Sequence, residues 1–219
     1  RDSESEKCIQ EVSNMIANEL SPHHFEMVDV VSFQAMLAYH ISQYSKSKSM
    51  FLENLNLARR YFGERHSKII TIYKYLGYLE MMDGDLKSVS FYFEKAFDLS
   101  KEIFGQDHPE TMSILDCIGH LHLKNGNLSN AEKAISTAFH FREKFFGRYH
   151  PDTAKSYSKL GQLYTHQGRF YEAVVQYKIA LEITKFCYDH QHPDTASAYS
   201  NLGSVYIDIG DYVNAMKNL

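Results

Sequence analysis

The stretch FGQDHPET, residues 104–111, returns as FGRYHPDT at residues 146–153 and, with changes, as CYDHQHPDT at residues 187–195. The His-Pro pair inside it recurs every 42 residues, at 108–109, 150–151 and 192–193. A fixed internal period of this kind is typical of repeat proteins, in which each unit is one supersecondary element. The phrase either carries repeated chemistry or marks the junction between repeated structural units.

Two sets of glycines keep the same period without a gap. The first set is Gly77, Gly119, Gly161 and Gly203, and the second follows seven residues later at Gly84, Gly126, Gly168 and Gly210. Apolar and small residues around them recur at spacings of three and four, as they do along one face of a helix. The pattern predicts two helices in each unit, joined at the second glycine.

The ends of these helices follow from residues with known positional preferences. Pro109 and its equivalents suit the first position of a helix, because proline has no N–H to lose there. The second glycine can adopt the left-handed conformation that ends a helix, and Asp85, Asn127 or Asp211 directly after it can cap the next one. Arg169 breaks this capping pattern in the third copy.

The first glycine lies inside the first helix, where it costs about 1 kcal/mol relative to alanine. Close approach of the second helix would compensate for that cost. We expect the contact to be made by small residues of the second helix, at Ala131, Ala173 and Ala215.

The third copy carries YxxLGxxY at residues 157–164 and AxxxYxxA at residues 173–180, and YxxLGxxY returns at residues 199–206. This pattern resembles the tetratricopeptide repeat consensus. The 42-residue period with its FGxxHPxT junction is similar to the repeats of kinesin light chains and of clustered-mitochondria proteins. The resemblance implies an all-α fold, an α-solenoid in which antiparallel helix pairs form a right-handed superhelix. It also implies a non-catalytic scaffold for protein–protein interaction.

The register divides the chain into six segments. We expect an N-terminal helix in 1–24 that caps the array or ends an earlier repeat, a degenerate repeat at 25–66, full repeats at 67–108, 109–150 and 151–192, and a partial repeat at 193–219. The match over 25–66 is weak, because Ser42 and Gln43 replace the Gly-Asp turn. The chain starts without methionine and stops within the pattern, so we expect it to be a segment of a longer protein.

Composition argues against several partners and locations. With 23 basic and 27 acidic residues, the formal charge of −4 supplies no field to hold nucleic acid or an anionic bilayer. No apolar run approaches the 18 or so residues of a membrane span, and the first residues are too charged for a signal peptide. Three cysteines without a CxxC pair favour a reducing compartment. We therefore expect a cytoplasmic protein without a nucleic-acid partner or direct membrane insertion.

Twelve histidines raise the question of a metal site, because His66, His108, His150 and His192 occupy equivalent positions. Equivalent residues one repeat apart are separated by at least the roughly 8–10 Å between neighbouring helices, whereas a metal needs its ligands about 2 Å away. We expect these histidines to cap the first helices. The sequence has no nucleophile elbow, phosphate-binding glycine loop or HExxH motif, so we assign no catalytic residue, metal or cofactor. Glu80 and Asp83 are expected on a solvated helix face.

The resemblance further implies that the first helix of each pair lines a concave surface used for partners. Residues there that the core does not use are the candidates for contact: Lys74 and Tyr78; Asp116, His120 and Lys124; Lys155, Ser158, Lys159, Gln162 and His166; Ser200, Asn201, Ser204 and Asp208. Asn201 resembles the groove asparagines of kinesin light chains. We expect a protein partner, or an extended or short helical peptide with acidic residues. An ordinary solvated face is the alternative interpretation.

Two other functions stay open on the sequence. Tetratricopeptide segments often flank catalytic domains, so one alternative is a regulatory or targeting module of a larger enzyme. The other is self-association to a homo-oligomer, because an incomplete last repeat would expose an apolar edge at Tyr206, Val213 and Leu219.

Overall fold

A computed structural model describes residue 11, residues 25–188 and residues 192–219 of the chain. Within these residues the only regular elements are α-helices, which follow one another in consecutive packed pairs. The chain divides into two compact units, residues 1–106 and residues 107–219, which are described separately. The N-terminal helix expected in residues 1–24 lies outside the described residues, apart from residue 11.

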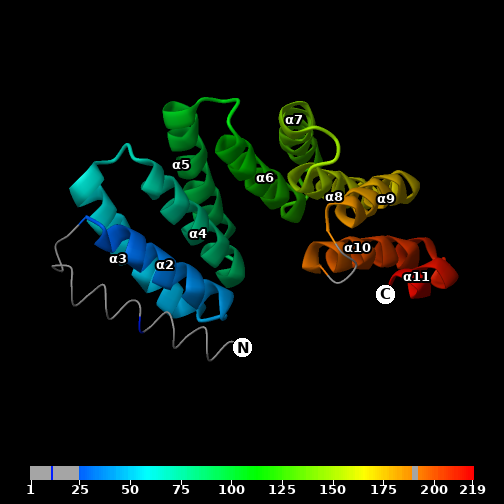
Figure 1. Cartoon of the computed structure of the whole chain (residues 1–219), viewed down its shortest axis with the longest axis horizontal. Coiled ribbons are helices and arrows are strands. Elements are labelled where there is room, and N and C mark those ends of the chain that lie inside the picture. The colour runs from blue at the N-terminus through cyan, green and yellow to red at the C-terminus, as the bar shows by residue number, and fades with distance from the viewer. Residues whose placement is uncertain (1–10, 12–24, 189–191) are drawn as a thin grey trace. The chain divides into compact units, whose positions relative to one another are not determined.

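In the first unit, α2 (Met27–His40) packs on α3 (Tyr44–Phe62), α3 packs on α4 (Ser67–Asp83), and α4 packs on α5 (Leu86–Phe104) (Figure 1). Short turns join the helices, so sequence neighbours run antiparallel. The turn between α2 and α3 contains Ser42 with a φ of 63°, the one positive value among described non-glycine residues. Ser42 therefore adopts the backbone conformation that glycine supplies at the equivalent Gly84.

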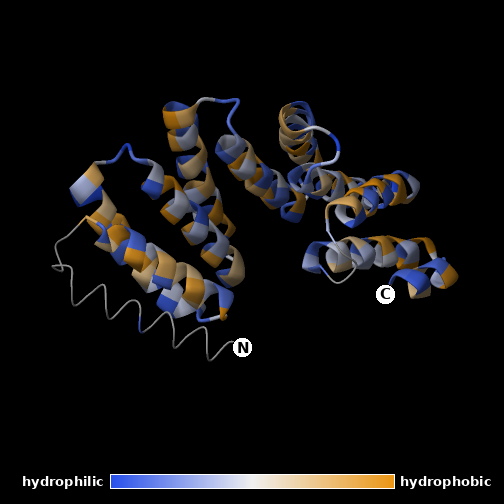
Figure 2. Ribbon diagram, viewed as in Figure 1, coloured by the Kyte–Doolittle hydropathy of each residue, from blue (hydrophilic) through white to orange (hydrophobic). Residues whose placement is uncertain are grey.

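The second unit contains α6 (Pro109–Lys124), α7 (Leu128–Phe146), α8 (Pro151–His166), α9 (Phe170–Cys187), α10 (Pro193–Ile209) and α11 (Tyr212–Asn218). Each helix packs on the next, and α8 also contacts α6 and α10. Figure 2 shows polar and apolar residues alternating along these helices. The buried apolar residues include Ile135, Leu163 and Ile183. The predicted all-α class with paired helices is confirmed in both units, while the six-segment division stays our assignment.

The His-Pro phrase is a helix cap. The Nδ1 atoms of His66, His108, His150 and His192 each accept a hydrogen bond from the backbone N–H two residues later, at 3.3, 3.1, 3.1 and 3.1 Å. The proline that follows three of these histidines is the first residue of α6, α8 or α10. The capping role predicted for the four histidines is confirmed.

The aromatic residue of the phrase has a role that the sequence did not reveal. Phe146 stacks on the capping ring of His150 with centroids 4.3 Å apart, and Tyr188 stacks on His192 at 3.8 Å. Between the stacked pair, Gly147 has φ 81° and ψ 172°, a conformation that is essentially restricted to glycine. The phrase thus closes one helix and caps the next.

The other predicted ends are also confirmed. Gly84 and Gly210 are left-handed caps of α4 and α10. Asp85, Asn127 and Asp211 accept backbone hydrogen bonds at the starts of α5, α7 and α11, whereas Arg169 makes no side-chain cap at the start of α9.

The glycines inside the first helices, such as Gly77 and Gly161, are contacted by other side chains than we expected. A Cβ atom on Gly161 would lie 2.6 Å from the ring of Tyr177, and one on Gly77 would lie 2.6 Å from the ring of Phe93. The close contact is therefore made by large side chains, and the expectation that small residues such as Ala173 make it is wrong. Because these rings are buried, they fill the space above the glycine that any side chain would occupy.

Candidate partner-binding site in the second unit

A hollow of about 400 Å³ opens in the second unit, and we call it the α8 pocket. It is lined by residues of α6, α8, α9 and α10 that lie on one side of the helix layer: His120, Ala154, Lys155, Ser158, Lys159, Gln162, Thr184, Asp194, Ser197, Ala198 and Asn201. Six of these, His120, Lys155, Ser158, Lys159, Gln162 and Asn201, belong to the predicted contact set. The structure therefore brings together, around one pocket, six of the residues that the sequence predicts to contact a partner.

Sequence reasoning missed the part of the pocket contributed by the start of α10. Ser197 and Asp194 lie four and seven residues before Asn201 and also line the pocket. Those spacings place all three residues on one helical face. The 3.6-residue period was available in the sequence, so extending the predicted face by two turns would have found them.

The pocket exists because three positions carry short side chains in this copy of the repeat. Forty-two residues earlier, the equivalents of Ser158, Thr184 and Ala198 are Asp116, Arg142 and Ser156. Those earlier residues fill the corresponding space: the guanidinium of Arg142 donates to the Asp116 carboxylate and, at 2.8 Å, to the Ser156 hydroxyl. With serine, threonine and alanine in their place, the space stays open.

This comparison corrects one predicted site residue. Asp116 was expected to project toward a partner, but only 4% of its surface is exposed, and it is paired with Arg142, which is 8% exposed. A carboxylate held in the core by a buried guanidinium is not available to a partner. The pair of Asp116 and Arg142 therefore joins α6 to α7, and the bond from Arg142 to Ser156 joins the pair to α8.

The two lysines of the pocket differ in their surroundings. The Lys155 amine lies 3.7 Å from the Asp194 carboxylate and 3.9 Å from that of Asp152. Lys159, which is half-buried, forms no ion pair with any residue in the described parts of the chain. Lys159 is therefore the cation of the pocket that can accept an anion from outside.

His120 lies in the same cationic region. Burial lowers the pKa of its imidazole, and the nearby charges of Lys159, Lys124 and His166 lower it further. Lys124 and His166 are thus close enough to act on His120, although they do not line the pocket. The lowered pKa favours the neutral imidazole, and the lysines supply the positive charge of the pocket.

The remaining candidates of α10 lie elsewhere. Ser200 lines a separate hollow of about 420 Å³ that faces the end of α11. Ser204 and Asp208 are exposed further along α10 and do not line the α8 pocket. The expectation that these α10 residues form one surface with Asn201 remains a prediction.

Two of the three residues that the sequence predicts for self-association are exposed. Val213 and Leu219 of the C-terminal segment are exposed at 68% and 72%, whereas Tyr206 packs against the buried cluster that contains Ala173 and Leu202. Tyr206 is therefore only half-exposed. Self-association through the other two residues stays a prediction.

The first unit holds the other two candidates, Lys74 and Tyr78, both half-buried on α4. The ring of Tyr78 belongs to an aromatic cluster, with centroids 6.0 Å from Tyr75, 6.3 Å from Tyr39 and 5.5 Å from Phe93. Its ring is thus mainly a packing group.

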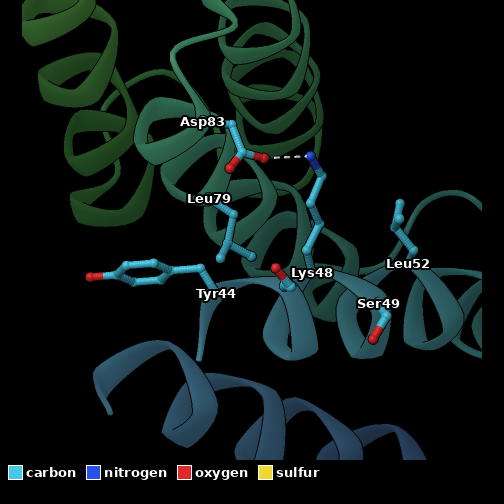
Figure 3. Close-up of a pocket in the computed structure, with 7 residues that line it drawn as sticks. Tyr44, Lys48, Ser49, Leu52, Leu79 and Asp83 are labelled. Atoms are coloured by element: carbon cyan, nitrogen blue, oxygen red, sulfur yellow. Dashed lines mark hydrogen bonds and ion pairs between the residues drawn. The ribbon is translucent and has the colours of Figure 1, made fainter. Parts of the chain in front are cut away.

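The first unit also holds a hollow of about 340 Å³, between α3 and the end of α4 (Figure 3). The Lys48 amine reaches Asp83 at 2.8 Å and Glu80 at 2.9 Å, and these hydrogen bonds raise the pKa of Lys48. Glu80 is buried, so the expectation of a solvated face is wrong for it. Because its lysine is already paired twice, this hollow is less suited to an anionic ligand than the α8 pocket.

Metal binding and membrane insertion find no support among the described residues. No group of three or more histidine, cysteine, aspartate or glutamate side chains among them is placed to hold a metal ion. None of their helices has both the length and the apolar character needed to cross a membrane.

Comparisons with solved structures show the same fold. The structure of BtubC (BKLC) from P. vanneervenii aligns with the whole chain and 86% of its own length, with a TM-score of 0.74 and 21% identity. A putative kinesin light chain from Podosopora anserina, described as having nearly identical TPR-like repeats, aligns with 89% of this chain and 92% of its own length, with a TM-score of 0.69 and 15% identity. A Rap protein complexed with Competence and Sporulation Factor aligns with 95% of this chain and 56% of its own length, with a TM-score of 0.77 and 14% identity.

The family itself is shown by the sequence comparison. No curated protein matches the chain. A sequence model described as tetratricopeptide repeat matches residues 110–185 and residues 157–219, which together make up just over half of the chain. The helix pairs, the YxxLGxxY register and this match agree, and the chain belongs to the tetratricopeptide repeat family.

Proposed function

We propose that this chain is a protein-interaction module that holds an acidic segment of a partner, extended or in a short helix, at the α8 pocket. The observation that carries the proposal is Lys159, a half-buried lysine without an ion-pair partner in the described structure, at the wall of a hollow of about 400 Å³. Gln162, Asn201 and Ser158 supply hydrogen-bonding groups beside it. The structurally similar Rap protein was solved with a bound factor, which supports a binding role for this fold.

The arrangement suits a peptide better than a small metabolite. The pocket is open, and its lining comes from four helices spread along the layer, so it offers a surface rather than an enclosed cavity. A peptide carboxylate at Lys159 would gain a charge-assisted contact, while the amides of Gln162 and Asn201 can bond to peptide backbone groups.

Reversing the charge of Lys159 is the direct test. We expect Lys159→Glu to weaken binding of a fluorescently labelled glutamate-rich peptide by about tenfold or more, because the pocket then repels the anion. Fluorescence anisotropy measures the affinity, and a glutamine-substituted twin of the peptide should bind both proteins equally weakly. Lys133→Glu is the matched control, since this exposed lysine of α7 makes the same change in net charge away from the pocket. Unchanged affinity in Lys159→Glu, or an equal loss in Lys133→Glu, would contradict the proposal.

A second test closes the pocket without changing net charge. The triple variant S158D/T184R/A198S copies the side chains of Asp116, Arg142 and Ser156 into the next repeat. We expect it to melt within a few degrees of the wild type by circular dichroism and to bind the labelled peptide at least about tenfold more weakly, because an internal ion pair then fills the space. A folded triple variant with wild-type affinity would show that the peptide binds elsewhere.

A further inference from the structure

His120 is the one histidine among the residues that line the α8 pocket, and histidine is the side-chain type that takes up a proton in mildly acidic solution. It follows Gly119 on α6, and its half-buried ring lines the pocket opposite residues of α8 and α10. Its place in the repeat is taken by Met36, Tyr78, Gln162 and Ser204 in the other copies, so histidine occurs once at this position. Any effect of its protonation is therefore local to this pocket.

The charged groups around His120 come from several elements. Its own helix contributes Lys124, and α8 contributes Lys159 and His166. Also on the pocket wall, α8 places Lys155 and α10 places Asp194, but these two are paired at 3.7 Å. From α9 the lining residue is the uncharged Thr184, and none of the lining residues comes from α7.

These surroundings favour the uncharged form of the imidazole while the pocket is empty. Burial is the largest cause of the lowered pKa of His120, and repulsion from Lys159, Lys124 and His166 adds to it. Each of these effects disfavours the protonated ring. A carboxylate placed beside Lys159 would offset that repulsion and would also attract a proton to the ring.

We propose that docking of a partner's acidic side chain at Lys159 is coupled to uptake of one proton by His120, so that the partner is held more tightly in mildly acidic than in neutral or alkaline solution. This inference rests on the proposed function of the α8 pocket. It adds a specificity element: the neutral His120 tolerates uncharged ligands, and its protonated form selects for anions.

The sign of the pH effect follows from linkage. The bound anion raises the pKa of His120 from its lowered value in the free protein. Below the free pKa the ring is protonated in both states, and above the bound pKa it is neutral in both. Affinity therefore falls as pH rises through the interval between the two values, by at most about tenfold per pH unit for one proton.

The test is a series of anisotropy titrations with the labelled glutamate-rich peptide between about pH 5.5 and pH 8, where glutamate side chains stay ionised. We expect wild-type affinity to fall about three- to tenfold across this range. His120→Gln, which keeps a hydrogen-bonding group but cannot take up a proton, should bind with nearly constant affinity. His122→Gln is the control, because it removes a histidine of the same helix that does not line the pocket.

Calorimetry in two buffers with different ionisation enthalpies counts the protons directly. We expect uptake of up to one proton per peptide bound by the wild type and by His122→Gln, and close to none by His120→Gln. A wild type that binds through Lys159 without pH dependence or proton uptake would overturn this inference and leave the proposed function intact. Proton uptake that persists in His120→Gln would also overturn it. Absence of peptide binding at every pH would overturn both.

Discussion

Replacing Asp116 with alanine should lower the stability of the second unit by about 3–5 kcal/mol, a loss larger than most single substitutions cause. The carboxylate is 4% exposed and pairs with Arg142, which is 8% exposed. Without it, the guanidinium stays buried with the Ser156 hydroxyl as its remaining side-chain partner. An uncompensated buried cation is the physical cause of the loss.

Chemical denaturation followed by circular dichroism measures the effect, and amide hydrogen exchange should place it in α6, α7 and α8. Local measurement is needed because helix pairs of a repeat array can open independently. Glu172→Ala is the matched control: it also removes a carboxylate paired with an arginine, at 2.6 Å, but that pair is exposed to solvent. We expect only a small change there.

A double replacement separates the charge from the packing. D116L/R142M removes both ions and keeps a similar apolar volume, so it should recover most of the stability lost in Asp116→Ala. If Asp116→Ala cost no more than Glu172→Ala, the guanidinium would have to reach water in the variant. That result would contradict the role assigned to the pair.

Gly161→Ala should destabilise the second unit by about 1–3 kcal/mol, although alanine is the better helix former by about 1 kcal/mol. The added Cβ would lie 2.6, 2.8 and 2.8 Å from three ring atoms of Tyr177. Tyr177 is 4% exposed and belongs to the buried cluster that contains Ala173 and Leu202, so its ring cannot move aside freely.

The sign of this effect should reverse when the ring is removed. On a Tyr177→Ala background, Gly161→Ala fills empty space and improves helix propensity, so we expect it to stabilise the protein by about 1 kcal/mol. Four denaturation curves, for the wild type, both single variants and the double variant, complete the cycle. Equal effects of Gly161→Ala on the two backgrounds would show that the contact with Tyr177 does not explain the glycine.

The predictions from the sequence were correct for helix ends, where the interacting residues lie within a few positions of each other in the chain. His150 caps the backbone two residues later, and Asp85 and Asn127 cap within three residues. Such local hydrogen bonds follow from residue type and position, so the helix ends could be assigned without coordinates. The partner of Gly161 was misassigned, because spacing identifies the helix that approaches but not which of its side chains reaches the glycine.

The proposed binding surface shows what the repeat register cannot predict. Asp116 and Ser158 hold equivalent positions, yet one is buried in an ion pair and the other lines the α8 pocket. The difference depends on the residue that reaches each of them from the second helix, Arg142 in one copy and Thr184 in the next. Because the same helix positions were predicted to contact a partner in every copy, both Asp116 and Ser158 were named as contact residues.

The amino-acid sequence by itself determined the 42-residue period, the paired helices, their caps and the family, because these depend on short-range preferences that every copy repeats. Only the tertiary structure decided which of the repeated positions line a pocket and which are buried. Asp116 and Arg142 are 26 residues apart, and their pairing depends on side-chain length and on the packing of α6, α7 and α8 together. A short side chain at the Arg142 position of the next repeat leaves a pocket, with Lys159 beside it, where a long one would have formed a core.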